Sequence, residues 1–414
     1  MNPTLTRSAE LVRAFSAEVA DQVVGRCAAL VAAPSVNPPG DTREMADLVQ
    51  AALRTAGLDA RQESAVPSMP SVISELDSGR PGPHLVLNVH LDTMPPGDES
   101  RWTVPVWELS RVDGRLHGLG MGNMKGAVAA MLSTVELLHR AREQWCGRIT
   151  FLAVSDEVVF GENGSAHLLR QHPDYAGDAL ICGEGPGFRR LAVAEKGVLW
   201  LRLSAHADGG HSSAVTRDAS AVSRLSRALV AVDDLNGREV ALPPELAAHW
   251  SGAVARELTL SVNAGTVAGG TFVGQIATEA AAELDLRLPP GLSADSAEQL
   301  VREAVAGVAG TEGQPVEVSR IKGWDANWTD PTSTVARAWG LATAELRGVG
   351  PTLAVRLPAS DASRWRQRGV PALCYGPQPS WSAGVDDYAE ESEVLGCVGL
   401  YTLTALTFLQ RSPA

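Results

Sequence analysis

The chain has 414 residues, of which 45% are hydrophobic and 20% charged, so its length and composition fit a globular protein of two domains. The net charge of -13 argues against nucleic acid as a partner, because no basic surplus is available to offset phosphates. No run of about 18 apolar residues occurs, which predicts no membrane span. The five cysteines are odd in number and form no C-x-x-C pair, and residues 1–27 contain no apolar signal-peptide core. We therefore expect a reduced, cytoplasmic compartment.

Short apolar strands alternate with amphipathic helices in the first part of the chain, a pattern typical of an α/β fold. The segments 84–90, 149–155 and 179–182 are expected to be buried strands, and 124–142 a helix with one apolar face. Chemically reactive side chains follow the strand ends: His90, Asp92, Asp156, Glu157 and Glu184. Because ligands bind at the carboxyl ends of strands in open α/β sheets, we expect the site at this edge.

The region after residue 196 has a different order of elements. We expect a strand at 198–207, a helix at 217–235, strands at 258–264 and 280–288, a helix at 293–308 and a strand at 315–321. This β-α-β-β-α-β order predicts a separate α+β domain. The chain then returns to helix, strand and helix, with the strand at 372–376 and the last helix at 391–409.

Several short motifs occur in order along the chain. They are Pro34 to Pro38, His90-Leu91-Asp92, the glycine-rich segment 118–126, Asp156-Glu157-Val158, Gly183-Glu184 and Arg287 to Gly291. This series resembles the zinc-dependent aminoacylase, acetylornithine deacetylase, succinyl-diaminopimelate desuccinylase and carboxypeptidase G family, over essentially the whole chain. The resemblance implies a three-layer α/β zinc-peptidase-like domain at 1–195 and 322–414. It also implies an inserted α+β lid domain at 196–321 through which a homodimer forms.

The resemblance assigns metal ligands to positions that have changed in this chain. It implies that His90 and Glu184 would hold a first zinc. The bridging carboxylate and the ligands of a second zinc fall on Asn123, Val158 and Gly384. Valine and glycine offer no side-chain ligand, and an amide cannot supply negative charge to two metals. We therefore expect no functional metal, and at most one zinc; the alternative for His90 is a histidine bonded to carboxylates without any metal.

Glu157 matches the general base of the family, which moves a proton between the water and the leaving nitrogen. A carboxylate beside Val158 is expected to have a raised pKa, and the alternative is a relic without a role. His90 and Glu184 complete the expected acid/base group. Asp92 is expected to orient His90, and Asp156 to support the group from behind.

The expected substrate contacts lie in both domains. The resemblance implies that His211 stabilises an oxyanion in the partner subunit, and that Arg287 meets a substrate carboxylate. Asn123, Asp361 and Trp381 are further candidates, although Asp361 could instead cap a helix and Trp381 could be plain packing.

Three functions stay open on the sequence. The first is an enzyme that performs metal-independent acid/base chemistry, such as cyclisation, condensation, isomerisation or amide cleavage, on a small amino-acid-derived substrate in specialised metabolism. The second is a one-metal amidohydrolase of the family type. The third is a non-catalytic binding protein that uses the cleft between the domains.

Overall fold

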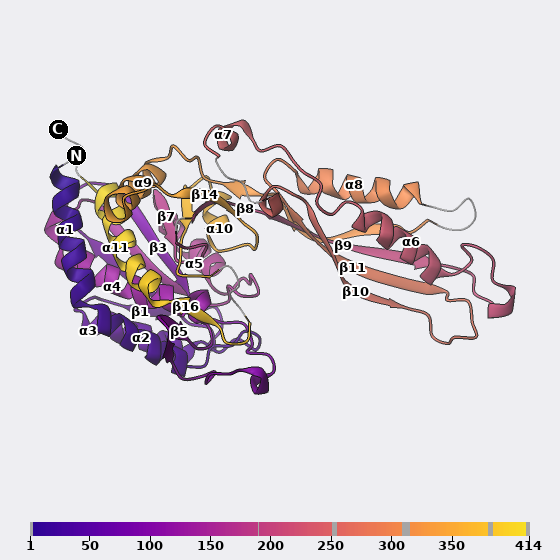
Figure 1. Cartoon of the computed structure of the whole chain (residues 1–414), viewed down its shortest axis with the longest axis horizontal. Coiled ribbons are helices and arrows are strands. Elements are labelled where there is room, and N and C mark those ends of the chain that lie inside the picture. The colour runs from indigo at the N-terminus through magenta and orange to yellow at the C-terminus, as the bar shows by residue number, and fades with distance from the viewer. Residues whose placement is uncertain (1–2, 189, 251–254, 309–314, 380–383, 411–414) are drawn as a thin grey trace. The chain divides into compact units, whose positions relative to one another are not determined.

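A computed structural model describes residues 3–188, 190–250, 255–308, 315–379 and 384–410. The chain forms two compact units (Figure 1). The first consists of Met1–Val193, Trp328–Ala354 and Ser360–Ala414, and the second of Ala194–Asn327 and Val355–Ala359. The assignment of residues 196–321 as a lid and dimerisation domain stays a prediction. Among the helices that the structure describes, none combines the length and the apolar character that a membrane span requires.

A nine-stranded sheet forms the centre of the first unit. Its order is β1 (Arg61–Glu63), β2 (Ser71–Asp77), β6 (Arg148–Val154), β3 (His84–His90), β7 (Ala179–Cys182), β15 (Ala372–Cys374), β8 (Arg190–Glu195) and β13 (Asn327–Trp328), with β14 (Thr352–Arg356) paired to β8. β6, β3, β7 and β15 are parallel neighbours. Their side chains are almost all buried, as expected for parallel strands covered on both faces. The strands predicted at 84–90, 149–155, 179–182 and 372–376 are confirmed, with ends shifted by two residues at most.

The first unit also contains helices, of which those at residues 43–55, 126–140, 334–347 and 362–366 contact strands of this sheet. The α-helices described in this unit are α1 (Pro3–Glu18), α2 (Ala20–Ala32), α3 (Arg43–Thr55), α4 (Gly126–Arg140), α5 (Ser165–Gln171), α9 (Thr334–Arg347), α10 (Ala362–Arg366) and α11 (Glu391–Phe408). α4 and α11 lie side by side, and α4 is buried along its length from Gly126 to Leu138 (Figure 1). A small sheet of β16 (Tyr388–Glu390), β5 (Arg115–His117) and β4 (Ser110–Val112) lies in the same unit. The predicted α/β class is confirmed.

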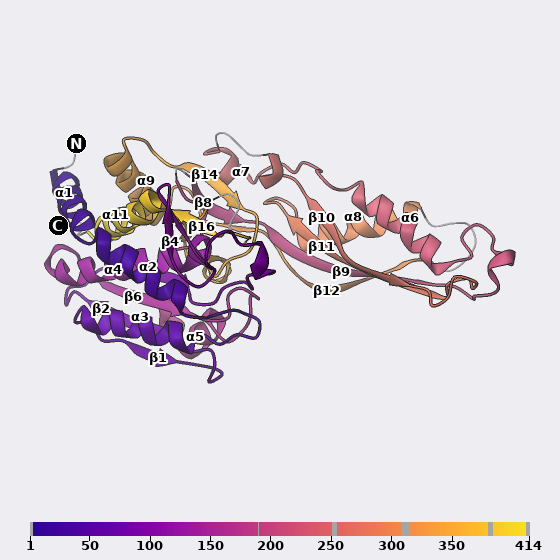
Figure 2. The ribbon, with the colours of Figure 1, turned by 60° about the horizontal axis from the view of Figure 1, so that its bottom comes forward.

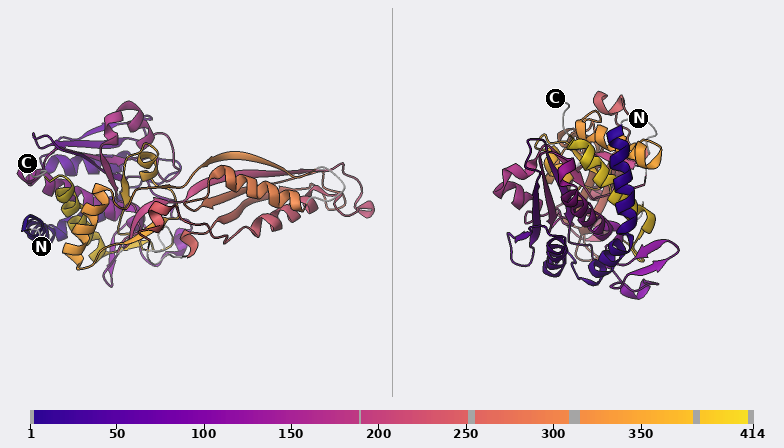
Figure 3. Two further views of the ribbon diagram at one scale, coloured as in Figure 1. Left: turned by 90° about the horizontal axis from the view of Figure 1, so that it is seen from above. Right: turned by 90° about the vertical axis from the view of Figure 1, so that its left-hand side faces the viewer.

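The second unit is a four-stranded antiparallel sheet with two helices on one face (Figure 2 and Figure 3). In chain order its main elements are β9 (Gly197–His206), α6 (Ala221–Asp233), β10 (Ser261–Gly269), β11 (Glu279–Leu288), α8 (Ala294–Gly307) and β12 (Glu317–Trp324); the short helix α7 (Pro244–Ala247) precedes β10. The predicted β-α-β-β-α-β order is confirmed. Burial alternates strictly along β11, because every second residue belongs to the core under the helices: Ala280, Ala282, Leu284, Leu286 and Leu288.

The two largest differences from the expected ranges in the second unit are at the start of α6 and at the end of β10. α6 begins at Ala221 rather than at residue 217, because Asp218 has a positive φ of 73° and Ser220 is extended. β10 continues to Gly269, five residues beyond the expected end, because a bulge between Ala264 and Thr266 restores its pairing with β11.

Candidate active site

Polar side chains gather at one edge of the main sheet. β3 ends at His90, and the segments after β6, β7 and β15 supply Glu157, Glu184 and Gln378. Since these strands are parallel neighbours, their carboxyl ends meet at the same edge. The structure therefore brings together the predicted group of His90, Asp92, Glu157 and Glu184, all of them buried.

The histidine ring has a fixed orientation. His90 Nδ1 lies 2.8 Å from the backbone oxygen of Asp92, and a carbonyl can only accept, so Nδ1 carries a proton and donates. His90 Nε2 then faces three oxygens: Asn123 Oδ1 at 3.2 Å, Glu184 Oε1 at 3.4 Å and Glu157 Oε2 at 3.6 Å. A bare nitrogen lone pair facing three oxygens is repelled by them. The arrangement therefore requires a proton or a cation between Nε2 and these oxygens.

Asp92 organises the segment that carries Glu157. Its carboxylate accepts from the backbone N–H of Glu157 (3.2 Å) and of Val158 (3.0 Å), and from Asn37 Nδ2 (2.9 Å). The carboxylate lies 3.5 Å from His90 Nδ1, so it is the backbone oxygen of Asp92 that holds the ring. Burial raises the pKa of Asp92, but the proximity and charge of His90 and the hydrogen bonds from Asn37 and Val158 outweigh it and lower the pKa overall.

Asp156 holds the turn that presents Glu157. It has a positive φ of 64°, and its backbone oxygen accepts from Gly161 N–H at 2.8 Å. Its carboxylate accepts from the backbone and side-chain nitrogens of Asn163 at 3.0 and 2.7 Å, and from Asn37 at 3.2 Å. Asn37 thus joins two carboxylates behind the site, Asp92 and Asp156.

The glycine-rich loop positions Asn123. The buried Asp387 accepts from the backbone N–H groups of Gly120 (2.9 Å) and Gly122 (3.2 Å), which fixes the loop just before Asn123. Gly120 has a φ of 83°, where a side chain would be strained, and an added Cβ would lie 2.5 Å from Thr93. The hydrogen bonds of Asp387 and the backbone conformation of Gly120 together place Asn123 at the site.

Gln378 is a site residue that the sequence analysis missed. Its amide nitrogen donates to Glu184 Oε2 at 2.8 Å and to Asn123 Oδ1. One signal could have found it: Gln378 is the first long polar side chain after the predicted strand 372–376, at the edge where ligands bind.

The buried ionisable groups of the site change each other's pKa values. Burial raises the pKa of Glu157 well above its ordinary value, and Glu184, Asp361 and Asp92 raise it further, while His90 opposes them. Burial lowers the pKa of His90, but Glu157, Asp92 and Glu184 outweigh it and raise that pKa well above its ordinary value. His90 and the carboxylates around it therefore hold a proton tightly at one point of the site.

Comparison with known proteins shows the family and the fold of the chain. The model of the Peptidase family M20/M25/M40 matches residues 86–407. The chain belongs to this peptidase family. It is similar to the succinyl-diaminopimelate desuccinylase of Methylorubrum extorquens, with 28% identity over 364 residues that cover 84% of this chain and 89% of the relative. The desuccinylase of Gluconacetobacter diazotrophicus is 27% identical over 395 residues, covering 92% and 94%.

Solved structures of the family share the fold. Human carnosine dipeptidase 1 superposes with a TM-score of 0.73 at 15% identity, covering 97% of this chain and 98% of that one. The Bacillus subtilis YXEP protein, described as a dinuclear metal binding peptidase from the M20 family, has a TM-score of 0.68 at 16% identity, covering 96% and 99%. At these identities the likeness shows the fold alone. The sequence relatives carry the names of hydrolases, which supports an enzyme.

Three residues of the site have the geometry of a cation site. One ligand atom each of His90, Glu157 and Glu184 lies within 4.8 Å of the other two, and all three residues are buried. The nitrogen–oxygen distances of 3.4 and 3.6 Å are close to the spacing of ligands around a zinc ion with bonds of about 2 Å. A single cation could therefore be held by this trio.

The other predicted substrate contacts are Asp361, His211, Arg287 and Trp381. Asp361 is buried beside α10 in the first unit, where its Oδ1 lies 3.5 Å from Arg364 Nε, and its side chain does not cap the helix. His211 and Arg287 belong to the second unit. His211 Nδ1 is 2.8 Å from Ser213 Oγ, and Arg287 donates to Asp285 at 3.0 and 3.2 Å. Trp381 lies outside the described residues, and the roles of all four stay predictions.

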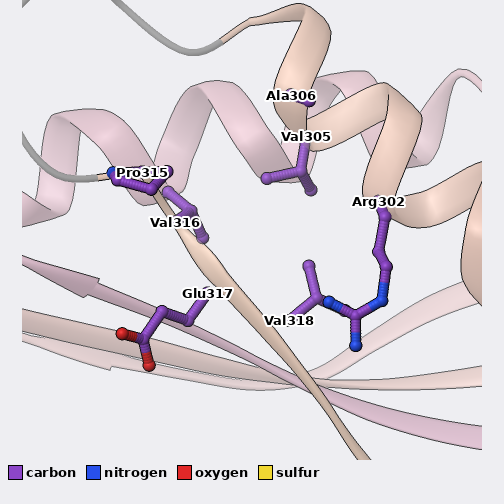
Figure 4. Close-up of a pocket in the computed structure, with 7 residues that line it drawn as sticks. All are labelled: Arg302, Val305, Ala306, Pro315, Val316, Glu317 and Val318. Atoms are coloured by element: carbon purple, nitrogen blue, oxygen red, sulfur yellow. The ribbon is translucent and has the colours of Figure 1, made fainter.

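Two of the cavities lined by residues that the structure describes can be compared with the buried group at the sheet edge. One of about 380 Å³ lies in the second unit between the end of α8 and the start of β12 and contains no predicted site residue; Arg302, Val305 and Val318 line it (Figure 4). A smaller one, about 20 Å³, is lined in part by Asn123 and Gly384. Chemistry and not cavity size therefore identifies the site.

Proposed function

We propose that this protein is an enzyme that acts on a small amino-acid-derived substrate by metal-independent acid/base chemistry. The observation that carries the proposal is the surrounding of His90 Nε2, which faces three oxygens while Nδ1 is committed to the backbone oxygen of Asp92. A proton at Nε2 satisfies this geometry. A protonated imidazole then supplies positive charge beside two buried carboxylates.

The residues at the metal-ligand positions favour metal-independent chemistry over a two-metal centre. Asn123, Val158 and Gly384 stand where the resemblance places the bridge and the ligands of a second metal. Two of these residues have no side-chain ligand, and an amide oxygen leaves the charge of two dications uncompensated. These residues do not fit two metals, and the proposed reaction does not depend on a two-metal centre.

Each residue of the group has a proposed role. Glu157 accepts or gives the proton that moves during the reaction, since a raised pKa brings a carboxyl group closer to neutral pH, where general acid/base catalysis is efficient. His90 is the second proton carrier, and Glu184 balances its charge. Asp92 and Asp156 fix the positions of these groups through backbone bonds.

The reactions that suit these groups need proton transfer and positioning. They are cyclisation, condensation, isomerisation or cleavage of an amide. The name of the sequence relatives, succinyl-diaminopimelate desuccinylase, supports a substrate derived from amino acids. His211, supplied by the partner of a homodimer, and Arg287, Asn123, Asp361 and Trp381 are proposed to contact this substrate.

A second candidate function is a one-metal amidohydrolase. The compact trio of His90, Glu157 and Glu184 favours it. When bound there, a metal would polarise the substrate carbonyl and activate water. His90 would act as a neutral ligand, because Nδ1 already donates to Asp92.

Elemental analysis tests the two candidates. The protein is purified without a metal-affinity tag or added zinc, and turnover of a panel of N-acyl amino acids, dipeptides and amino-acid amides is followed with and without chelator. Substoichiometric metal with chelator-resistant turnover supports acid/base chemistry. Near one zinc per chain, with turnover that chelator removes and zinc restores, would overturn it in favour of the one-metal hydrolase.

A further inference from the structure

The side chain of Gln378 lies within the group of catalytic carboxylates. It comes from the loop after β15, and it is buried, with an exposed fraction of 7%. Its amide nitrogen donates to Asn123 Oδ1 and, at 2.8 Å, to Glu184 Oε2. These two acceptors come from the glycine-rich loop and from the segment after β7. One amide therefore joins three separate parts of the chain at the site.

The chemistry of the two acceptors fixes the direction of the amide. A carboxylate oxygen can only accept, and Asn123 Oδ1 already faces His90 Nε2 at 3.2 Å. The reverse orientation would place the oxygen of Gln378 against both acceptors. An amide nitrogen has two hydrogens, so these two bonds use both of them.

Packing around Gly185 holds Gln378 in place independently of these bonds. A Cβ at Gly185 would lie 2.3 Å from Gln378 Oε1 and 2.6 Å from its Cβ. A Cβ at Gly376 would lie 1.9 Å from the backbone oxygen of Gly183. The loops that carry Glu184 and Gln378 thus approach each other closely only because glycine stands at these positions.

A cation held by His90, Glu157 and Glu184 Oε1 would lie beside this amide, which donates to the other oxygen of Glu184. The buried N–H groups of the amide would then lie close to a positive charge, which is unfavourable, and their bond already engages the carboxylate that the cation needs. The amide of Gln378 thus stabilises the Glu184 carboxylate with hydrogen bonds, where a divalent cation would stabilise it with positive charge.

We propose that Gln378 is a positioning residue that fixes Asn123 and Glu184 by hydrogen bonds and thereby lowers the affinity of the site for a divalent cation. The proposal goes beyond the proposed function, because it concerns a residue outside the acid/base group and an equilibrium that can be measured without any substrate. It makes exclusion of metal an active property of this chain.

Manganese binding tests the proposal. The probe is Mn²⁺, whose free six-line electron paramagnetic resonance spectrum is titrated with wild type, Gln378→Ala and Gln378→Met. The matched control is Gln367→Ala, an exposed glutamine of the same unit. Methionine keeps most of the volume beside Gly185 without donors, and its thioether is a poor ligand for Mn²⁺. The Gln378→Met variant decides the result if the Gln378→Ala variant fails to fold.

We expect both Gln378 variants to bind Mn²⁺ at least about tenfold more tightly than wild type and the Gln367 control, the factor that corresponds to one hydrogen bond of about 1.4 kcal/mol. The gain should disappear when His90→Gln is added to the same variants. Equal affinity in wild type and both variants, whether weak or strong, would overturn the proposal, as would a gain that survives loss of His90. None of these outcomes decides the proposed function, which depends on native metal content and chelator resistance.

Discussion

The two histidines of strand β3 stand at opposite ends of the same seven-residue strand, and both are buried. At the amino end, His84 Nε2 is bonded to Thr150 Oγ1 at 2.8 Å, and Arg148 donates to Nδ1 at 3.3 Å. At the carboxyl end, His90 Nε2 faces Glu157 and Glu184.

Their pKa values move in opposite directions. Burial lowers the pKa of His84, and the charge of Arg148 lowers it further. Burial also lowers the pKa of His90, but Glu157, Asp92 and Glu184 outweigh it and raise that pKa. The comparison teaches that carboxylates gathered at the carboxyl edge, and not burial, raise the pKa of His90.

Replacing Glu157 by glutamine removes the main charge at the His90 end. We expect turnover of the substrate found in the panel to fall by about 10²–10⁴-fold, because general acid/base catalysis contributes about that much. The dissociation constant of the substrate should change little, since glutamine keeps the size of the side chain. Steady-state kinetics and calorimetric binding measure the two quantities.

The control is Glu143→Gln, an exposed carboxylate of the same unit that pairs with Arg80 at 2.9 Å. It should keep wild-type turnover. Wild-type turnover in the Glu157 variant would show that Glu157 is not the catalytic acid or base. Loss of substrate binding together with turnover would favour a binding role for Glu157.

The sequence predicts the edge of the sheet well, because local patterns determine it. The apolar runs that end at His90 and Cys182 are buried strands as expected, and reactive residues follow each of them. The motif around Glu157 is continuous along the chain, so its assembly with His90 follows once the strands are parallel neighbours.

Other features of the site depend on contacts between distant segments. Gln378 meets Asn123 across 255 positions of the chain, and Asn37 meets Asp156 across 119. Asn37 lies in the motif Pro34 to Pro38, and Gln378 follows a predicted strand, but neither pattern indicates which distant residue the side chain meets. The backbone oxygen of Asp92, which holds His90 Nδ1, is likewise invisible in a motif that lists only side chains.

Replacing His90 by glutamine tests the carboxyl end of the strand. We expect the free energy of unfolding at pH 6 to fall by about 3 kcal/mol, because buried carboxylates lose their positive partner. The raised pKa means that the folded state keeps its proton above pH 6.5, where the unfolded state loses it. The difference between wild type and variant should therefore shrink as pH rises above about 6.5 toward the folded pKa. Urea unfolding between pH 6 and 9 measures it, and a difference independent of pH would contradict a charged His90.

Replacing His84 by glutamine tests the amino end of the strand. The expected loss in the free energy of unfolding is smaller than for His90, and its dependence on pH has the opposite sign. We expect a loss of about 1 kcal/mol near pH 7.5, the value of one hydrogen bond, because Thr150 loses its partner. The lowered pKa means that the unfolded state takes up a proton below about pH 6.5 while folded His84 stays neutral. Wild type therefore loses stability relative to the variant as pH falls, and the difference should narrow between pH 7.5 and pH 5. If His84→Gln and His90→Gln had the same pH dependence, burial alone would govern both histidines, and the carboxylate edge would have no special effect on proton binding.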